Sequence, residues 1–177
     1  MAARNRLPPW HEMVRTADGR ELLIRPIRPD DAVPLRAGFP LLEPDALHGQ
    51  LLRSEGGITP EAAERLTHPD PRREFAIVAS EPLPAGEALI GAVARIGIVD
   101  DSRRAEFAIL VGRFIAGMGM GRHLMRRLVR WAKGKKLEQV YGDVAEDNQP
   151  MLALAESLGF RRESVPQPGF VRVVLDL

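Results

Sequence analysis

The pattern of apolar and polar positions predicts a chain built from both strands and helices. Some stretches alternate apolar and polar residues or form short apolar runs, and others place apolar residues three and four apart. Strand patterns cover residues 14–27, 73–79, 88–99, 104–111, 137–144, 160–165 and 170–177. Helical spacing covers residues 32–36, 44–53, 59–66, 119–133 and 147–158. This order predicts an α/β (α+β) single domain with a central sheet covered by helices.

Turn and capping residues mark several element boundaries. Asp18 and Gly19 give a turn signal between apolar segments, so residues 14–27 are predicted to form a hairpin. Thr59 followed by Pro60 favours a helix start, because the threonine side chain caps the first amides and proline fits the first turn. Gly159 is expected to end the last helix.

The composition is that of an ordinary globular domain. The chain has 177 residues, of which 45% are apolar and 28% charged, which is enough to bury a core. Residues 1–12 contain two consecutive prolines and no periodicity, so we expect a loose lead-in there and a domain over residues 13–177. The net charge of +1 gives no general attraction to nucleic acid or to an anionic membrane.

Several residue types that would carry other chemistry are missing. The chain has no cysteine, which excludes a disulfide framework, a thiolate zinc site and a cysteine nucleophile. Its histidines show no metal-ligand spacing, so no metal is expected. No apolar run approaches the ~20 residues of a membrane span, and the start lacks a signal-peptide core. We therefore expect a soluble cytoplasmic protein that binds neither nucleic acid nor a membrane.

The segment from Gly117 to Arg122 has the residues of a phosphate-binding turn. It reads Gly117, Met118, Gly119, Met120, Gly121, Arg122 and continues into a helical pattern. Glycines let the backbone approach an anion closely. The first N–H groups of a helix lack intrahelical partners and lie at the positive end of its dipole. A phosphate-bearing ligand is predicted here, and a tight turn that serves only packing is the alternative.

Two common phosphate-binding patterns do not fit this segment. A Walker loop needs Lys and then Ser or Thr after the last glycine, where this chain has Arg122 and His123. A dinucleotide fingerprint would need a third glycine at residue 122. A Rossmann-like binder stays as a weaker alternative.

Two longer segments resemble the motifs of one superfamily. Residues 105–111, the glycine segment and Leu124 resemble motif A of the GNAT acyl-CoA N-acyltransferases. Residues 144–160, with Asn148 and the closing Gly159-Phe160, resemble motif B. The resemblance implies a GNAT-like fold, with a central mixed, mostly antiparallel sheet flanked by helices. It also implies acetyl-CoA as co-substrate and an amine as acceptor.

Three further stretches resemble the acetyltransferase domain of the bacterial protein lysine acetyltransferase Pat family. They are residues 23–31, residues 59–79 and residues 151–155. This resemblance implies a protein lysine side chain as the acceptor. A monomer or homodimer is expected. A small-molecule amine acceptor and a non-catalytic acyl-CoA-binding regulatory domain are the alternatives.

The resemblance also implies which residues hold coenzyme A. The backbone from Gly117 to Arg122 would bind the pyrophosphate, and the Arg122 side chain is a candidate for the phosphates. The main chain of Ile109, Leu110 and Val111 would pair with the pantetheine arm. Asn148 would touch the cofactor, or cap the helix that follows it, or both.

Glu106 is the candidate general base. An alkylamine with a pKa of ~10.4 is almost wholly protonated at neutral pH, so a base is needed. Strand alternation places Ala108 and Leu110 on the face of Glu106, and apolar neighbours should raise the pKa of its carboxyl group. Pat-like domains carry a glutamate at the matching place, which implies the same role. A glutamate that faces solvent or pairs with Arg104 is the alternative.

A dedicated general acid is not expected. Many members of the superfamily use a tyrosine in the last helix to protonate the leaving thiolate, and Ala155 stands at the matching position. The single tyrosine of the chain, Tyr141, lies on the preceding strand. A thiol with a pKa of ~8.5 can leave with help from solvent.

Overall fold

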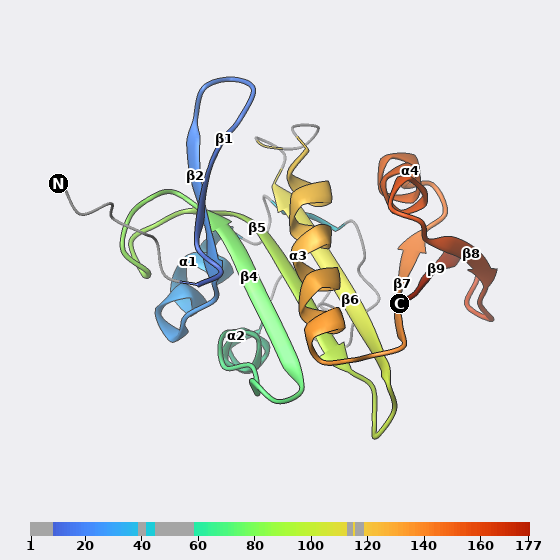
Figure 1. Ribbon diagram of the computed structural model, residues 1–177. Helices are drawn as coiled ribbons and strands as arrows, with labels where there is room; N and C mark the ends of the chain where they lie inside the picture. Colours follow the sequence, from blue (N-terminus) through green and yellow to red (C-terminus); the bar gives the residue numbers. More distant parts are fainter. Residues whose placement is uncertain (1–8, 39–41, 45–58, 113–114, 116–118) are drawn as a thin grey trace, which may run out of the picture.

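The computed structural model describes residues 9–38, 42–44, 59–112, 115 and 119–177. Within these residues nine strands form one sheet, and four α-helices pack on it (Figure 1). The strands are β1 (Glu12–Arg15), β2 (Glu21–Pro26), β3 (Leu42–Pro44), β4 (Glu74–Ser80), β5 (Ile90–Ile98), β6 (Arg104–Gly112), β7 (Gln139–Ala145), β8 (Arg161–Ser164) and β9 (Phe170–Asp176). The helices are α1 (Ala32–Gly38), which follows a 3-10 turn (Pro29–Asp31), α2 (Pro60–Thr67), α3 (Met120–Gly134) and α4 (Gln149–Ser157).

The sheet is mixed but mostly antiparallel. Its strand order is β1-β2-β4-β5-β6-β7-β9-β8, and β3 pairs with β6 beside this path. Every neighbouring pair is antiparallel except β6 and β7, which are parallel because α3 returns the chain between them. The sequence-based prediction of a single α+β domain with this kind of sheet is confirmed.

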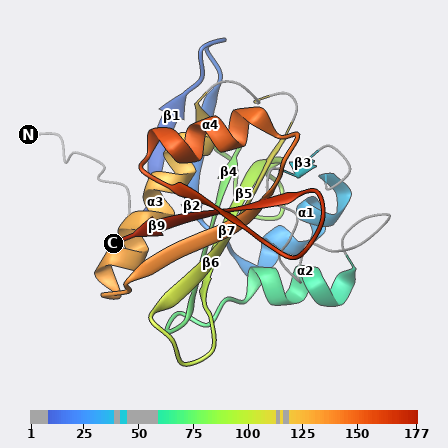
Figure 2. The same cartoon turned by 90° about the vertical axis from the view of Figure 1, so that its right-hand side faces the viewer.

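Helices cover both faces of the sheet. The apolar stripe of α3 and the buried side of α4 pack on one face, and α1 and α2 pack on the other. Figure 2 shows α3 on one side of the strands and α1 and α2 on the opposite side. Strand β6 serves both cores, since Phe107 and Ile109 lie in the α3 core while Ala108 and Leu110 lie in the α1–α2 core.

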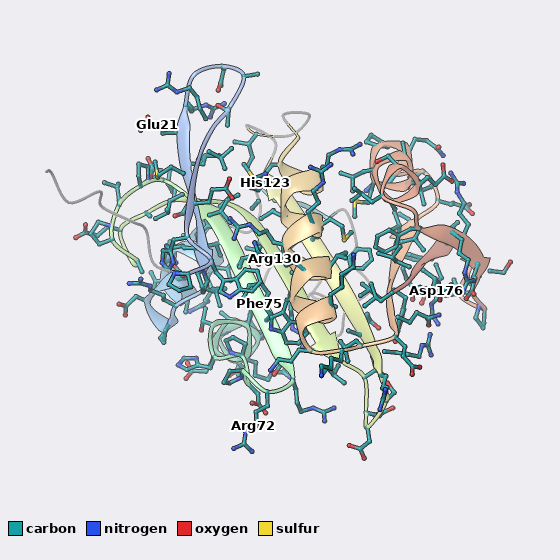
Figure 3. All side chains as sticks on the ribbon, viewed as in Figure 1. Glu21, Arg72, Phe75, His123, Arg130 and Asp176 are labelled. Carbon is teal, nitrogen blue, oxygen red and sulfur yellow. The ribbon has the colours of Figure 1, made fainter. Side chains whose placement is uncertain are left out.

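The segment just before β1 packs against α3. The ring of Trp10 lies 4.8 Å from that of Phe75 on β4, and Phe75 stacks on Trp131 of α3 at 5.9 Å. The carboxylate of Glu12 accepts a hydrogen bond from Arg127 and lies 3.1 Å from Nε2 of His123. Figure 3 marks Phe75 and His123 on this side of the molecule. Residues 10–12, which fall in the expected lead-in, are thereby held by aromatic and charged contacts.

Apart from the helix expected over residues 44–53, the expected elements occur with boundaries shifted by at most two residues. Thr59 caps α2 by accepting a hydrogen bond from the Ala62 amide at 3.1 Å, as expected. Gly19 and Gly159 both adopt a positive φ, which suits their turn and helix-end positions. The prediction of a helix over residues 44–53 is wrong at its first residue, because Pro44 is the last residue of strand β3. The rest of that stretch lies outside the described residues.

Candidate active site

The parallel strands β6 and β7 pair over a short length and then part. Their register joins Arg104 to Gln139, Ala105 to Val140 and Glu106 to Tyr141. Both strands continue beyond this last pair, to Gly112 and Ala145, while β7 keeps pairing with β9. The Glu106–Tyr141 pair therefore lies where two parallel strands separate in the middle of the sheet.

Glu106 stands at this point with its side chain half-buried. Its partner on the adjacent strand β5 is Gly97, which has no side chain to cover Glu106. Burial raises the pKa of the Glu106 carboxyl group, and the charge of Asp143 raises this pKa further. A side-chain hydrogen bond from Tyr141 and the charges of Arg95 and Arg172 oppose the rise. The raised pKa predicted from the apolar neighbours on the strand is thus found.

The alternative prediction is that Glu106 pairs with Arg104. Arg104 instead contacts Gln139 and Tyr141. Its Nε donates a hydrogen bond to Oε1 of Gln139 at 2.7 Å. Its guanidinium carbon lies 4.6 Å from the centre of the Tyr141 ring. Arg104 therefore stacks on the tyrosine next to Glu106.

Tyr141 is the residue of this region that the sequence analysis did not connect with Glu106. Its side chain is buried and shares a face of the sheet with Glu106, because the two residues are partners in the parallel register. The Arg172 guanidinium carbon also lies 4.6 Å from the ring centre. Burial, and then the charge of Glu106, raises the pKa of the Tyr141 hydroxyl, so the hydroxyl keeps its proton at neutral pH.

Asp143 follows Tyr141 on the same face of β7 and is also buried. It accepts hydrogen bonds from Nε of Arg172 at 2.8 Å and from Nη2 of Arg172 at 3.1 Å. Arg95 on β5 donates to Oε2 of Glu74 at 2.6 Å. The carboxylates of Glu74 and Asp143 thus bond to arginines from neighbouring strands, whereas the hydrogen-bonding influence on Glu106 comes from the neutral Tyr141 hydroxyl.

The expected phosphate end of the site is the start of α3. Gly119 precedes the helix with φ +78°, and no side chain among the described residues caps the first amides. A Cβ added to Gly121 would lie 3.2 Å from Cδ1 of Leu154 on α4, so this glycine allows α3 and α4 to approach closely. Met120 is buried in the α3 core. Gly117 and Met118, also predicted to hold the cofactor, lie outside the described residues.

Arg122 and Asn148 make contacts that tie α4 into this end of the site. Nη2 of Arg122 donates to Oγ of Ser157 at 2.6 Å, which joins the first turn of α3 to the end of α4. Oδ1 of Asn148 accepts a hydrogen bond from the Met151 amide at 3.2 Å, so Asn148 caps α4 as its capping alternative predicted. Contact of either residue with coenzyme A stays a prediction.

The strand residues predicted to pair with the pantetheine arm have buried side chains. Ile109 and Val111 lie in the α3 core and Leu110 in the opposite core, so only their main chain is available to a ligand. The edge of β6 away from β5 is occupied at this point by β3, with Pro44 opposite Leu110 and Glu43 opposite Val111. This pairing was not anticipated, since three extended residues carry too little pattern to be recognised.

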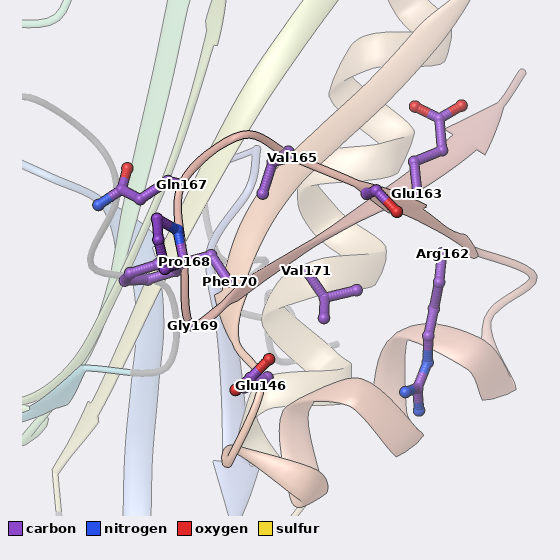
Figure 4. A pocket seen from close by; sticks show the side chains of 10 residues that line it. Glu146, Arg162, Glu163, Val165, Gln167, Pro168, Gly169, Phe170 and Val171 are labelled. Carbon is purple, nitrogen blue, oxygen red and sulfur yellow. The ribbon is translucent and has the colours of Figure 1, made fainter.

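A pocket of about 420 Å³ lies at the carboxyl end of β7, beside the loop between β8 and β9 (Figure 4). The Glu146 amide donates to the Gly169 carbonyl at 2.9 Å and fixes this loop to the end of β7. The lining residues are Glu146, Arg162, Glu163, Ser164, Val165, Gln167, Pro168, Gly169, Phe170 and Val171. The pocket is lined by polar and apolar groups from the residue that follows β7, from β8, from the β8–β9 loop and from the start of β9.

Neither a metal site nor a membrane helix is found in the described part of the chain. No three histidine, aspartate or glutamate side chains of residues 9–38, 42–44, 59–112, 115 and 119–177 gather where they could hold a metal ion. None of the helices formed by these residues is long and apolar enough to cross a membrane.

Comparison with known proteins defines the class. Residues 47–160 match the model of the acetyltransferase (GNAT) family, and the chain belongs to this family. A protein of Pseudomonas aeruginosa named Acetyltransferase PA5475 is 28% identical over 143 residues, which are 81% of this chain and 76% of that protein. The chain is therefore a transferase of the GNAT acetyltransferase family, whose members use acetyl-CoA and an acceptor amine.

Solved structures share the fold over nearly the whole chain. The GNAT domain of S. lividans PAT superposes with a TM-score of 0.79 at 20% identity, and the match covers 97% of this chain and 100% of that domain. Mycobacterium smegmatis RimJ, solved in complex with CoA-disulfide, has a TM-score of 0.62 at 17% identity and covers 94% of this chain and 86% of that one. At these identities the likeness establishes the fold.

Proposed function

We propose that this acetyltransferase moves an acetyl group from acetyl-CoA directly to a lysine side chain of a protein, with Glu106 as the general base. The observation that carries the proposal is the half-buried Glu106, with its raised pKa, at the point where β6 and β7 separate. A base needs a pKa closer to neutrality than that of an exposed carboxylate, and burial supplies this shift.

The proposed reaction has a single transfer step. Glu106 takes a proton from the acceptor ammonium, directly or through water. The amine nitrogen then attacks the thioester carbonyl carbon, and the C–N bond forms while the C–S bond breaks to release the coenzyme A thiolate. The acylated nitrogen loses its second proton to solvent, which gives the neutral amide. The chain has no cysteine to carry the acetyl group, which agrees with direct transfer. Ala155 is fully buried in the α3–α4 core, so the thiolate would be protonated by solvent.

Main-chain groups would hold most of the acetyl-CoA. The amides from Gly117 to Gly121 and of Arg122, at the start of α3, would bind the pyrophosphate, since helix N-termini favour anions. The pantetheine arm would follow β6 at Ile109, Leu110 and Val111, and Asn148 would approach it from the start of α4. The close packing of Gly121 against Leu154 supports this arrangement, because it holds α4, the helix that Asn148 caps, against the start of α3.

An exposed strand at the sheet edge beyond Glu106 and Tyr141 supports a protein as the acceptor. Strands β6, β7, β9 and β8 lie side by side, and register places Glu163 of β8 opposite Arg172 of β9 on the face that Glu106 shares with Tyr141 and Asp143. Helices α1 and α2 pack on this face over strands nearer to β4. All of β8 is exposed. The resemblance to Pat-family domains favours a lysine side chain, and the exposed strand β8 gives a macromolecule a surface to contact.

Calorimetry followed by a turnover assay tests the proposal. Acetyl-CoA is expected to bind, and thiol release is expected with lysine-containing proteins rather than with free amines. The Glu106→Gln variant should bind acetyl-CoA with unchanged affinity and lose turnover. Glu138→Gln, at an exposed glutamate before β7, is the matched control. Turnover only on small amines would show that the acceptor is a small-molecule amine rather than a protein. Binding of acetyl-CoA without turnover on any acceptor would indicate a regulatory domain.

A further inference from the structure

The environment of Tyr141 assigns this residue a function beyond packing. It is the single tyrosine of the chain, and it lies directly across the parallel β6–β7 register from Glu106. Register partners on one face of a sheet bring their side chains close enough to interact. The Tyr141 hydroxyl lies near the Glu106 carboxylate, and its hydrogen-bonding influence lowers the pKa of that carboxyl group.

The Tyr141 ring is held from the strands on either side of β7. Arg104 reaches it from β6 and Arg172 from β9, each with its guanidinium carbon 4.6 Å from the ring centre. Both arginines are anchored in turn, Arg104 by Gln139 at 2.7 Å and Arg172 by Asp143 at 2.8 Å. Guanidinium groups attract the face of an aromatic ring, so the two contacts fix where the hydroxyl lies.

We infer that Tyr141 is a positioning residue, which holds one oxygen of the Glu106 carboxylate and leaves the other oxygen for the proton of the acceptor amine. This inference rests on the proposed role of Glu106 as the base. Proton transfer slows when the side chain of the base samples rotamers that point its carboxylate away from the amine. A hydrogen-bond donor in a fixed position limits this rotamer exchange. Tyr141 acts through Glu106, so its effect should disappear when the Glu106 carboxylate is removed.

The same contact tunes the proton affinity of Glu106. The charged and titratable groups around it are Arg104 from its own strand, Arg95 from β5, Tyr141 and Asp143 from β7, and Arg172 from β9. A hydroxyl that donates to the carboxylate stabilises its charged form and lowers its pKa. Loss of the hydroxyl therefore raises this pKa. The acid limb of the pH–rate profile, where kcat/KM falls because Glu106 becomes protonated, then moves to higher pH.

The Tyr141→Phe variant tests the inference, because it removes the hydroxyl and keeps the ring between its arginines. We expect kcat to fall about tenfold or more, since a hydrogen bond to a charged group is lost. The acid limb of kcat/KM should move to higher pH, and the affinity for acetyl-CoA should stay within about twofold. Ser102→Ala removes an exposed hydroxyl from the turn between β5 and β6 and should change neither quantity.

A double-mutant cycle separates positioning from a merely structural effect. In the Glu106→Gln background, Tyr141→Phe should change kcat by less than about twofold. An equal loss in both backgrounds, or an unmoved acid limb, would overturn the inference. Arg104→Lys keeps the charge but loses the planar stack, and should give a smaller shift of the limb in the same direction. Thermal unfolding of each variant confirms that the fold is retained.

The outcomes also separate this inference from the proposed function. If Glu106→Gln keeps the rate of the wild type, the base assignment itself is wrong. If Glu106→Gln is inactive while Tyr141→Phe behaves as the wild type, only the positioning role is wrong.

Discussion

The contact between Gly142 and Phe107 makes a sharp prediction about how β6 and β7 are held. Gly142 follows Tyr141 on the opposite face of β7, and Phe107 follows Glu106 in the same way on β6. A Cβ added to Gly142 would lie 2.5 Å from Cε1, 2.6 Å from Cζ and 2.9 Å from Cδ1 of Phe107. These separations are well below van der Waals contact, so Gly142→Ala requires the ring or a strand to move.

The Phe107 ring has little room to move away. It is 2% exposed and lies 5.8 Å from the Phe160 ring in an edge-to-face arrangement. Adding a methyl group to a well-packed core costs about 1–3 kcal/mol of unfolding free energy. For a domain of this size the loss corresponds to a Tm lower by about 2 to 12 °C. Because the displaced strands carry Glu106 and Tyr141 on their other face, kcat should fall as well.

Thermal unfolding and turnover of Gly142→Ala measure both effects. Gly134→Ala is the matched control, since beyond its own stretch of helix no atom lies within 4 Å of its added Cβ. Alanine is favoured over glycine in a helix, so this control should be neutral or stabilising by up to about 1 kcal/mol. Phe107→Leu combined with Gly142→Ala should cost less than the sum of the two single changes. An unchanged Tm and kcat in Gly142→Ala, or additive losses in the double variant, would refute the reasoning.

Two further predictions concern the frame of the domain and the cofactor edge. Asp31 is fully buried and accepts hydrogen bonds from Nη1 and Nη2 of Arg25 at 2.7 and 2.8 Å, so Asp31→Ala leaves a buried guanidinium unpaired. Urea unfolding should show a loss of about 3–5 kcal/mol, and a loss below about 1 kcal/mol would contradict this role. Acetyl-CoA should increase hydrogen exchange of the β3 amides, because β3 and the proposed pantetheine site use the same edge of β6. Unchanged exchange there would argue against that placement of the arm.

Most of the helices and strands could be predicted from the sequence, because each has a local pattern of apolar, capping or turn residues. The alternation along β6 correctly placed Ala108 and Leu110 on the face of Glu106, and the capping residues Thr59 and Asn148 act as expected. Strand β3 was missed because Leu42–Pro44 is too short to show a period, and its position depends on pairing with a distant strand.

The surroundings of Glu106 could be predicted only in part. Burial on an apolar face follows from alternation within one strand, and it accounts for the largest contribution to the raised pKa. The Tyr141 contact depends on the register between β6 and β7, which the chain sets through the length and packing of α3. A single sequence contains no direct sign of that register, nor of the arginines that β6 and β9 bring to the tyrosine ring.

The pH dependence of kcat/KM in wild type and Glu106→Gln tests most directly whether Glu106 takes the proton of the acceptor amine. Burial raises the pKa of Glu106 above the ordinary value of 4.5, and the base works when deprotonated, so the wild-type rate should rise as pH increases through that raised pKa. Glu106→Gln should lack this limb, turn over about 10²- to 10⁴-fold more slowly near neutrality, and recover partly as the pH approaches the amine pKa of ~10.4. Wild-type rates in Glu106→Gln at neutral and at high pH alike would contradict the account.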